Sequence, residues 1–451
     1  MNMPREINVQ SFISAQKLSR MQITVLLLSF CVVAVDGFDT ALIAFIAPAL
    51  RAEWHLTPGD LSSLFSAGLV GLMTGALLFG PLADRYGRKT ILLVSVGLFG
   101  AACLSCVLAD SLRTLAVLRF VTGIGLGGAM PMAVTLSSEY APERHRSVLV
   151  TAMFCGLTLG AGLGGVLAAH IVNEWGWRAV LVVGGVLPLA LLPLLMVAMP
   201  ESASYLVTRK ADPERVRRVL RRIAPAENFS AVAWTAPAAP AGSPVRQLFD
   251  ANLRRGTALI WVTFFMSLLV IYLLSNWLPT VISSTGMSLM EASVITAMFQ
   301  VGGTVGAISV GQMMDRLKPS RVLALAYLLG AGFTALIGSS AGHKGALMLS
   351  VFGAGFCVSG GQVGVNALTA AYYPTSNRAT GVGWASGIGR IGSVVGAVAG
   401  GWMLTLGFGL PVMFAVIGIP ALIACASLFA MDRGTTHAEK PSAASSTAAA
   451  R

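Results

Sequence analysis

Four charged residues lie inside long apolar runs of this 451-residue chain, where an isolated charge is costly. They are Asp36, Asp39, Arg119 and Arg390. A charged side chain at the centre of a membrane helix costs roughly 2.5–3.5 kcal/mol on insertion scales, so such residues generally serve a function. The two residue types suggest two kinds of chemistry, proton exchange by the carboxyl groups and binding of an anion by the guanidinium groups.

Asp36 and Asp39 are three positions apart and therefore share one face of a helix. Two carboxylates on one buried face repel each other when both are ionised, which favours the binding of a proton by one of them. A proton-coupled carrier requires such a proton-exchanging pair. Alternatively, both carboxylates stay charged and only stabilise the fold through arginine partners.

The two arginines are candidates for binding a carboxylate, because a guanidinium group offers two parallel donors that match the two carboxylate oxygens. At 1.5 Å per helical residue, Arg390 lies roughly 17 Å into its run, close to the middle of a membrane. Arg390 is therefore the first candidate, with helix packing or gating as the alternative. Arg119 is the second, because the same estimate places it level with Asp36, where it can instead neutralise an aspartate.

Further polar and aromatic residues within the apolar runs are candidates for contact with a solute. The amides can alternatively form hydrogen bonds between helices, which are common in membranes, and the aromatic residues can simply pack. These candidates are the amides Asn276, Gln300, Gln362 and Asn366 and the aromatic residues Phe154, Tyr272 and Trp384.

The elements that must position these residues are membrane-spanning helices. The chain is 55% apolar and only 11% charged, its mean hydropathy is +0.76, and soluble domains carry about 25% charged residues. A spanning helix needs roughly 20 apolar residues. The sequence predicts an all-α polytopic membrane protein with twelve transmembrane helices, near 22–46, 60–82, 90–109, 112–137, 148–171, 178–199, 256–281, 290–313, 321–341, 345–370, 379–403 and 410–431.

The spans form two sets of six, which predict two pseudo-symmetric six-helix bundles at residues 21–199 and 256–432. Residues 1–20 form an N-terminal arm, and a polar central loop at 200–255 joins the bundles. Within that loop, the Ala/Pro-rich segment 232–244 has the composition of a linker. Residues 433–451 are expected to form a polar, disordered tail.

The distribution of Lys and Arg predicts the orientation in the membrane, because basic residues gather in cytoplasmic loops. Most of them lie in the arm, the central loop, the tail and the loops on the same side. The opposite loops contain only Arg51, Arg113, Arg178 and Lys344. Both termini are therefore expected in the cytoplasm, with the chain in the inner membrane. This bias also explains the net charge of +12 without a nucleic-acid partner.

Two motifs recur in both halves of the chain. Asp84-Arg85 follows the second span and Asp315-Arg316 follows the eighth, while similar Tyr-, Pro- and Arg-containing segments end the fourth and tenth spans. The two repeats have nearly the same offset, which predicts that the bundles are related by a pseudo-two-fold axis along the membrane normal. In such an arrangement the solute site lies between the halves, near mid-membrane.

The segment Gly80-Pro-Leu-Ala-Asp84-Arg85-Tyr-Gly87-Arg88-Lys89 resembles the signature that follows the second span in the major facilitator superfamily. Pro200-Glu201-Ser202 after the sixth span resembles a further signature of that superfamily. A narrower resemblance is to its aromatic acid/H⁺ symporter family. The motifs that carry it are Asp36-Gly37-Phe38-Asp39, Ala47-Pro48-Ala49-Leu50, the glycine-rich stretch that begins at Arg119, and Gly387-Ile-Gly389-Arg390.

This resemblance implies proton-coupled uptake of an aromatic acid by alternating access, with transporters of 4-hydroxybenzoate or protocatechuate as the most similar members. Imported acid would enter aromatic catabolism. Carriers of gentisate, benzoate, muconate or hydroxyphenylpropionate share most of the motifs and remain alternatives. The resemblance also implies a gating role for a set of loop charges, which can alternatively act as topology anchors. The set is Asp84, Arg85, Arg88, Glu139, Arg146, Asp315, Arg316 and Arg378.

Other classes of function find little support in the sequence. The five histidines lie in loops or at span ends without metal-ligand spacing, and there is no phosphate-binding loop, so we expect neither an enzyme nor a metal or cofactor. A solute sensor that binds without transporting is the rival of another class, although it has no evident use for the paired aspartates. The expected partners are a small aromatic carboxylate, protons and the lipid bilayer, and the expected state is a monomer.

Overall fold

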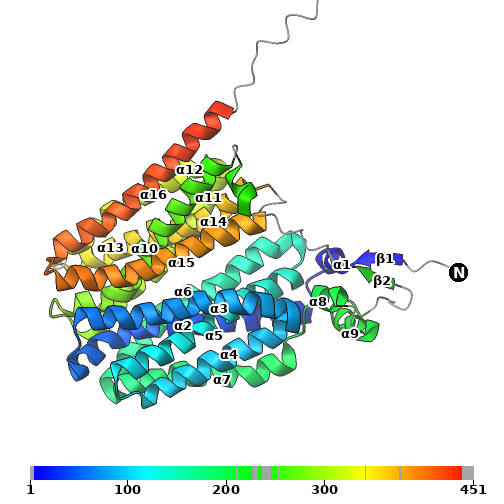
Figure 1. Ribbon diagram of the computed structural model, residues 1–451, viewed down its shortest axis with the longest axis horizontal. Coiled ribbons are helices and arrows are strands. Elements are labelled where there is room, and N and C mark those ends of the chain that lie inside the picture. The colour runs from blue at the N-terminus through cyan, green and yellow to red at the C-terminus, as the bar shows by residue number, and fades with distance from the viewer. Residues whose placement is uncertain are drawn as a thin grey trace, which may run out of the picture. The chain divides into compact units, whose positions relative to one another are not determined.

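The structure is a computed structural model that describes residues 5–209, 212–225, 227, 232–235, 245–250, 253–340, 342–374 and 378–438. Twelve helical segments among these residues are long and apolar enough to cross a membrane, and each coincides with one of the predicted spans (Figure 1). The prediction of an all-α polytopic membrane protein is confirmed.

The spanning helices of the first half are α2 (Arg20–Trp54), α3 (Pro58–Tyr86), α4 (Arg88–Ser105, continued by the 3₁₀ turn η1, Cys106–Leu108), α5 (Leu112–Tyr140), α6 (Arg146–Trp175) and α7 (Trp177–Ala198). Those of the second half are α10 (Arg254–Ser283), α11 (Leu289–Arg316), α12 (Pro319–Ser339), α15 (Arg378–Thr405) and α16 (Leu410–Ala438). The tenth span is interrupted by a π-helical turn and consists of α13 (Lys344–Ala354), η4 (Gly355–Ser359) and α14 (Gly360–Tyr372).

Local sequence signals explain where several of these helices begin. Ser19 and Gln22 form a capping box at the start of α2, and Thr57 and Asp60 form another at the start of α3. Between α3 and α4 the chain turns within the single residue Gly87, whose φ of +100° suits only glycine. The helix α2 has 35 residues, so it extends beyond the apolar run 22–46 that predicted it.

The predicted arm and central loop contain more structure than their composition indicates. The arm contributes β1 (Arg5–Asn8) and α1 (Val9–Ala15), whereas the central loop contributes α8 (Ala203–Thr208), α9 (Pro213–Ile223), β2 (Val232–Thr235) and η3 (Val245–Phe249). A further short turn, η2 (Glu143–His145), precedes α6.

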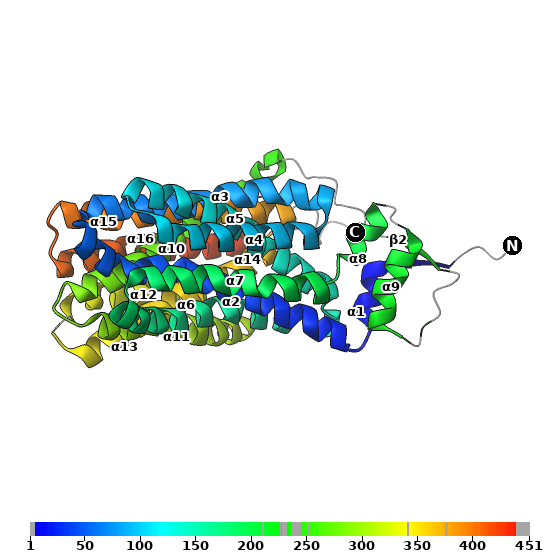
Figure 2. The ribbon, with the colours of Figure 1, turned by 90° about the horizontal axis from the view of Figure 1, so that it is seen from below.

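The strands β1 and β2 pair in parallel, with Arg5 opposite Val232, and Figure 2 shows α1, α8, α9 and β2 gathered at one end of the first six spanning helices. We call this end the arm end. The rest of the predicted linker, 236–244, and residues 439–451 of the predicted tail lie outside the described residues, whereas residues 433–438, expected to be disordered, continue α16.

The helices pack into two compact units. Unit 1 comprises Met1–Ala241 with Ser275–Gln300 and Ala397–Thr405, and unit 2 comprises Gly242–Leu274, Val301–Gly396 and Leu406–Arg451. The two later segments therefore pack with the first six spanning helices, although they belong to the second half of the sequence.

Contacts around Trp277 join these two segments to α3 within unit 1. The Trp277 indole donates a hydrogen bond of 2.9 Å to the Ala397 carbonyl, and Phe65 meets its ring edge to face at 5.2 Å. Ser62 donates to the Val398 carbonyl at 3.4 Å. Packing rather than sequence order thus assigns the ends of α10 and α15 to unit 1.

Glycines bring α3 and α5 into close contact. A Cβ atom on Gly75 would lie 2.0 Å from the Ile124 carbonyl oxygen, and one on Gly71 would lie 2.1 Å from that of Phe120. From the opposite side, a Cβ on Gly127 would lie 2.2 Å from the Leu72 carbonyl oxygen. The small residues therefore set the distance between the two backbones, as is usual for helix packing in membranes.

We expect Gly75→Ala to lower the free energy of unfolding by about 1–3 kcal/mol, because the added methyl group must push α3 away from α5. The matched control is Gly80→Ala on the same helix, where no atom lies within 4 Å of the added Cβ. Thermal unfolding of both variants in the same detergent is the measurement. Equal stability of the two variants would show that the contact does not limit the packing.

Candidate functional site

A buried ion pair between α2 and α5 is the main feature of the candidate site in unit 1. The Arg119 guanidinium donates to both carboxylate oxygens of Asp39, from Nη1 to Oδ1 and from Nη2 to Oδ2, each at 3.0 Å. Nη2 also donates to the Asp39 carbonyl at 3.3 Å. Asp39 is fully buried and Arg119 is 4% exposed. The two-pronged geometry satisfies both charges where water does not reach them.

Asp36 has a different environment although it lies only one helical turn away. It is 2% exposed, and its Oδ1 accepts a hydrogen bond of 3.3 Å from the Thr40 hydroxyl. The structure therefore distinguishes the two aspartates that the sequence presents as a pair. Asp39 is held by an arginine, whereas Asp36 accepts from a neutral hydroxyl.

The glycine between the two aspartates lets α2 approach α6. A Cβ on Gly37 would lie 2.1 Å from the Leu157 carbonyl oxygen, and a Cβ on Gly160 would lie 1.9 Å from that of Ala34. The motif Asp36-Gly37-Phe38-Asp39 thus has two structural tasks. Asp39 pairs with α5, while Gly37 allows close contact with α6.

In unit 2, the charged candidate residue is Arg390 on α15. Its Nη1 donates to the Tyr272 hydroxyl on α10 at 3.0 Å. The two helices are in close contact there. A Cβ on Gly392 would lie only 2.2 Å from the Phe265 carbonyl oxygen. Arg390 is half-buried and its guanidinium group has five N–H donors, so the contact with Tyr272 fixes the group without using its full capacity.

The structure shows hydrogen bonds or unsatisfied polar atoms at three of the four candidate amides. Gln362 Nε2 donates to Asn366 Oδ1 at 3.3 Å on α14, just after the π-helical turn. Among the described residues, the buried atoms Gln362 Oε1 and Asn276 Nδ2 have no hydrogen-bond partner. Buried polar atoms are normally satisfied, so these two are suited to bind a solute or water. The fourth amide, Gln300, lies beside Gly162 of α6, where a Cβ would be 3.5 Å away.

The aromatic candidates differ in their packing. Trp384 stacks on Trp261 with ring centres 5.8 Å apart, and Phe249 meets Trp261 edge to face at 5.5 Å. Phe154 on α6 is 37% exposed and Trp384 is 45% exposed. Trp384 is therefore stacked on one aromatic neighbour and still partly exposed.

The candidates are thus divided between the two units. Asp39 with Arg119, Arg390 with Tyr272, and Gln362 with Asn366 are the pairs that the structure brings together. Unit 1 contains Asp36, Asp39, Arg119, Phe154, Asn276 and Gln300, and unit 2 contains Tyr272, Gln362, Asn366, Trp384 and Arg390.

The predicted gating charges at the arm end form local contacts. Arg88 Nη2 lies 2.9 Å from Asp84 Oδ1, and Arg209 at the end of α8 donates to the Asp84 carbonyl at 2.9 Å. The Arg85 carbonyl accepts a hydrogen bond of 2.9 Å from the Tyr205 hydroxyl. The loop between α3 and α4 is therefore fastened to α8.

Glu139 and Arg146, two of the gating candidates, each have a partner outside the predicted set. Glu139 accepts a hydrogen bond from the Ser202 hydroxyl, and Arg146 donates to Ser14 Oγ of α1 at 2.9 Å. In unit 2, three further gating candidates are exposed, namely Asp315, Arg316 and Arg378.

Glu201 organises the arm end and was not among the sequence-based candidates. Its Oε1 accepts from the backbone N–H groups of Lys89 at 3.0 Å and Ser202 at 2.9 Å, and its carbonyl accepts from the Tyr140 hydroxyl. Glu201 thus connects the start of α4 and the end of α5 to the segment that follows α7. The Pro200-Glu201-Ser202 signature was the available signal, although the sequence did not reveal its partners.

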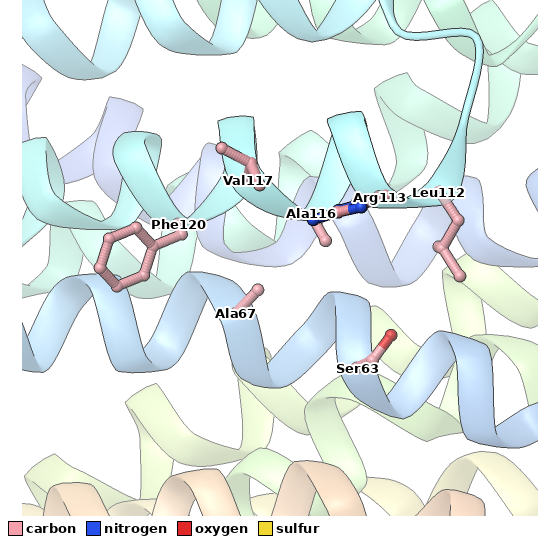
Figure 3. Close-up of a pocket in the computed structure, with 7 residues that line it drawn as sticks. All are labelled: Ser63, Ala67, Leu112, Arg113, Ala116, Val117 and Phe120. Atoms are coloured by element: carbon pink, nitrogen blue, oxygen red, sulfur yellow. The ribbon is translucent and has the colours of Figure 1, made fainter.

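The structure also contains a shallow groove between α3 and α5, which Figure 3 shows in close-up. Its lining is almost entirely apolar and includes none of the predicted solute-binding residues. The groove is therefore separate from the candidate site residues described above. It is lined by Ser63, Ala67, Leu112, Arg113, Ala116, Val117 and Phe120.

The chain matches the family model of the Major Facilitator Superfamily over residues 29–341 and again over 260–450. This class of protein fits the twelve spans and the charges buried among them. The chain belongs to the major facilitator superfamily, whose members are membrane transporters and not enzymes.

Similar proteins include a gallate transporter of Pseudomonas putida, which is 45% identical over 94% of this chain and 95% of its own length. The 4-hydroxybenzoate transporter PcaK of Pseudomonas aeruginosa is 44% identical, with the same coverage of both chains. Among solved structures, the xylose transporter XylE of E. coli matches with a TM-score of 0.71 over 91% of this chain and 98% of its own. Its 18% identity supports the fold alone.

We expect Asp39→Asn and Arg119→Gln each to lower the free energy of unfolding by about 3–5 kcal/mol, because each leaves a buried group without its partner. The double variant should lose clearly less than the sum of the two losses. Thermal unfolding in detergent is the measurement.

The control for this cycle is Arg178→Gln, which removes an exposed ion pair with Glu53 and should cost less than about 1 kcal/mol. Strictly additive losses for Asp39→Asn and Arg119→Gln would contradict a direct interaction between the two side chains.

Proposed function

We propose that this protein takes up an aromatic carboxylate together with protons, with 4-hydroxybenzoate or protocatechuate as the favoured substrate. It works in the cytoplasmic membrane with both termini inside, as the positive-inside bias predicts. The observation that carries the proposal is the presence of two unlike charged centres within the spans, the Asp39–Arg119 pair with Asp36 and the Arg390–Tyr272 pair. The relatives named above support the substrate class.

The Arg390–Tyr272 pair is the proposed anchor for the carboxylate. Tyr272 holds the guanidinium group from one side, so the side chain loses little freedom when an anion binds. A benzoate-type acid offers two oxygens that match the guanidinium fork. In the same unit, the unsatisfied Oε1 atom of Gln362 is suited to contact a ring hydroxyl group.

Asp36 is the proposed site of proton exchange. Arg119 donates two hydrogen bonds to the Asp39 carboxylate and is therefore its structural partner. Asp36 lies on the same buried helix face one turn from Asp39 and accepts a hydrogen bond from the Thr40 hydroxyl, and two charged carboxylates this close together repel each other. A proton on Asp36 removes this repulsion. The protonated and deprotonated forms of Asp36 therefore favour different conformations of the protein.

The loop charges at the arm end are proposed to control access. The contacts of Arg209 and Tyr205 with the carbonyls of Asp84 and Arg85 fasten the α3–α4 loop to α8. Such contacts contribute to the balance between alternating states when they exist in one state and break in the other. Asp315, Arg316 and Arg378 are proposed to act in the same way in the second half.

The direct test is uptake of radiolabelled 4-hydroxybenzoate into proteoliposomes with and without an inward proton gradient. We expect accumulation above equilibrium only with the gradient, because the gradient supplies the free energy for uphill transport. Protein-free liposomes are the control for passive entry of the neutral acid. Binding of the acid without any uptake would overturn the proposal in favour of a solute sensor.

The choice of ring substituents is tested by competition. We expect protocatechuate and gallate to compete with 4-hydroxybenzoate, because relatives of similar identity are named for 4-hydroxybenzoate and gallate. The amide 4-hydroxybenzamide has the same ring without the carboxylate and should not compete. Equal competition by this amide would show that no carboxylate anchor exists.

Replacing Arg390 by Lys should raise the KM for uptake by about 10- to 100-fold, since the charge remains but one charge-assisted hydrogen bond is lost. Arg113→Lys, at an exposed position near the start of α5, is the matched control and should leave the KM unchanged. Initial rates of uptake over a range of substrate concentrations give the KM. An unchanged KM for Arg390→Lys would remove Arg390 from the role of anchor.

A further inference from the structure

The helix α9 at the arm end separates apolar and basic residues onto different faces. Val216, Leu220 and Ile223 are buried and belong to the same core cluster as residues of α1, α2 and α4. Arg215, Arg218 and Arg222 occupy another face, because they are spaced three and four residues apart. Arg221 lies beside them, and all four arginines are exposed.

The acidic side chains near α9 do not neutralise the charge of these arginines. Asp212 caps the start of the helix by accepting from the Glu214 N–H group, and Glu214 pairs with Arg217 at 2.6 Å. Within the part of the chain that the structure describes, no acidic side chain bonds to the four exposed arginines. A dense positive surface therefore remains, and it is accessible to an external anion.

The position of Arg222 places this surface next to the membrane boundary. Arg222 lies within electrostatic range of Lys89, the second residue of α4. Lys89 Nζ in turn donates to the Met196 carbonyl near the end of α7 at 2.6 Å. Met196 and Val197 are 54% and 80% exposed. Exposed apolar side chains on a spanning helix face lipid, so Lys89 and Arg222 lie where the hydrocarbon region meets the headgroups.

We propose that the arginine face of α9, defined as Arg215, Arg218, Arg221 and Arg222, binds the headgroups of anionic phospholipids together with Lys89. The guanidinium groups match the phosphate oxygens in geometry and charge. The apolar face of α9 is already buried in the protein, so the helix contacts the lipid surface through charge and does not insert into the hydrocarbon. The proposal depends on the membrane location of the chain and not on the identity of its solute.

Lipid binding at this face has a route to the transport machinery. The helix α8 precedes α9 by a few residues, and its Tyr205 and Arg209 hold the carbonyls of Arg85 and Asp84 in the α3–α4 loop. An anionic lipid that fixes α9 therefore also steadies the contacts of α8 with that loop. Anionic lipid should stabilise the arm end as a whole.

The test uses the purified full-length chain in a neutral detergent, titrated with dioctanoyl phosphatidylglycerol and followed by the shift in thermal unfolding. Dioctanoyl phosphatidylcholine and inorganic phosphate are the comparison probes. The variant is Arg218→Gln/Arg222→Gln. Its matched control is Lys17→Gln/Arg144→Gln, which removes the same charge from exposed positions in the arm and in η2.

We expect phosphatidylglycerol to stabilise the protein at lower concentration than either comparison probe, and less so at high salt because the charges are screened. Removing two of the arginines should weaken its apparent affinity by about 25-fold, at roughly fivefold per basic residue near a membrane surface. The control variant should change the affinity for phosphatidylglycerol by less than about threefold, well below the loss of about 25-fold expected for the α9 variant.

Three results would overturn the proposal. Equal stabilisation by phosphatidylcholine would remove the requirement for an anionic headgroup. Equal stabilisation by inorganic phosphate would show a site for the free anion and not for a lipid. An equal loss in the control pair would assign the effect to net charge and not to the arginine face of α9.

Discussion

The structure depends on the two-pronged ion pair between Asp39 and Arg119, because neither charge could stay buried without the other. Breaking such a pair costs about 3–5 kcal/mol, whereas forming it offsets the loss of water around both groups. The pair joins α2 to α5. The close approaches at Gly37 and Gly75 then bring α6 against α2 and α3 against α5. Charge pairing and small residues together therefore define the packing of the first bundle.

The same pair makes the two aspartates chemically unequal. Asp39 is paired with Arg119, while Asp36 accepts a hydrogen bond from the Thr40 hydroxyl. The fork of Arg119 is filled by Asp39, which leaves Arg390 with Tyr272 as the better anchor for an external carboxylate. One guanidinium group thus serves structure and the other is suited to the solute. This division of labour is the physical basis of the proposed coupling.

Sequence patterns predicted the spanning helices well, because a run of apolar residues has only one stable form in lipid. Depth along the helices also indicated that Arg119 can reach an aspartate. The partners of Arg390, Glu139 and Glu201 were not predictable, since they depend on how distant helices rotate about their axes. The helices α8 and α9 were missed because short polar segments lack a spanning signal and are stabilised by packing against the arm.

The central claim, that Asp36 carries the proton while Asp39 stays paired with Arg119, is tested most directly by the Asp36→Asn variant. Proteoliposomes containing the pH-sensitive dye pyranine report proton entry when a 4-hydroxybenzoate gradient is applied, and exchange of labelled substrate reports solute movement. Protein-free liposomes correct for diffusion of the neutral acid. The account predicts that Asp36→Asn retains exchange but loses substrate-driven proton entry. Proton entry at the wild-type ratio to solute in this variant would contradict it.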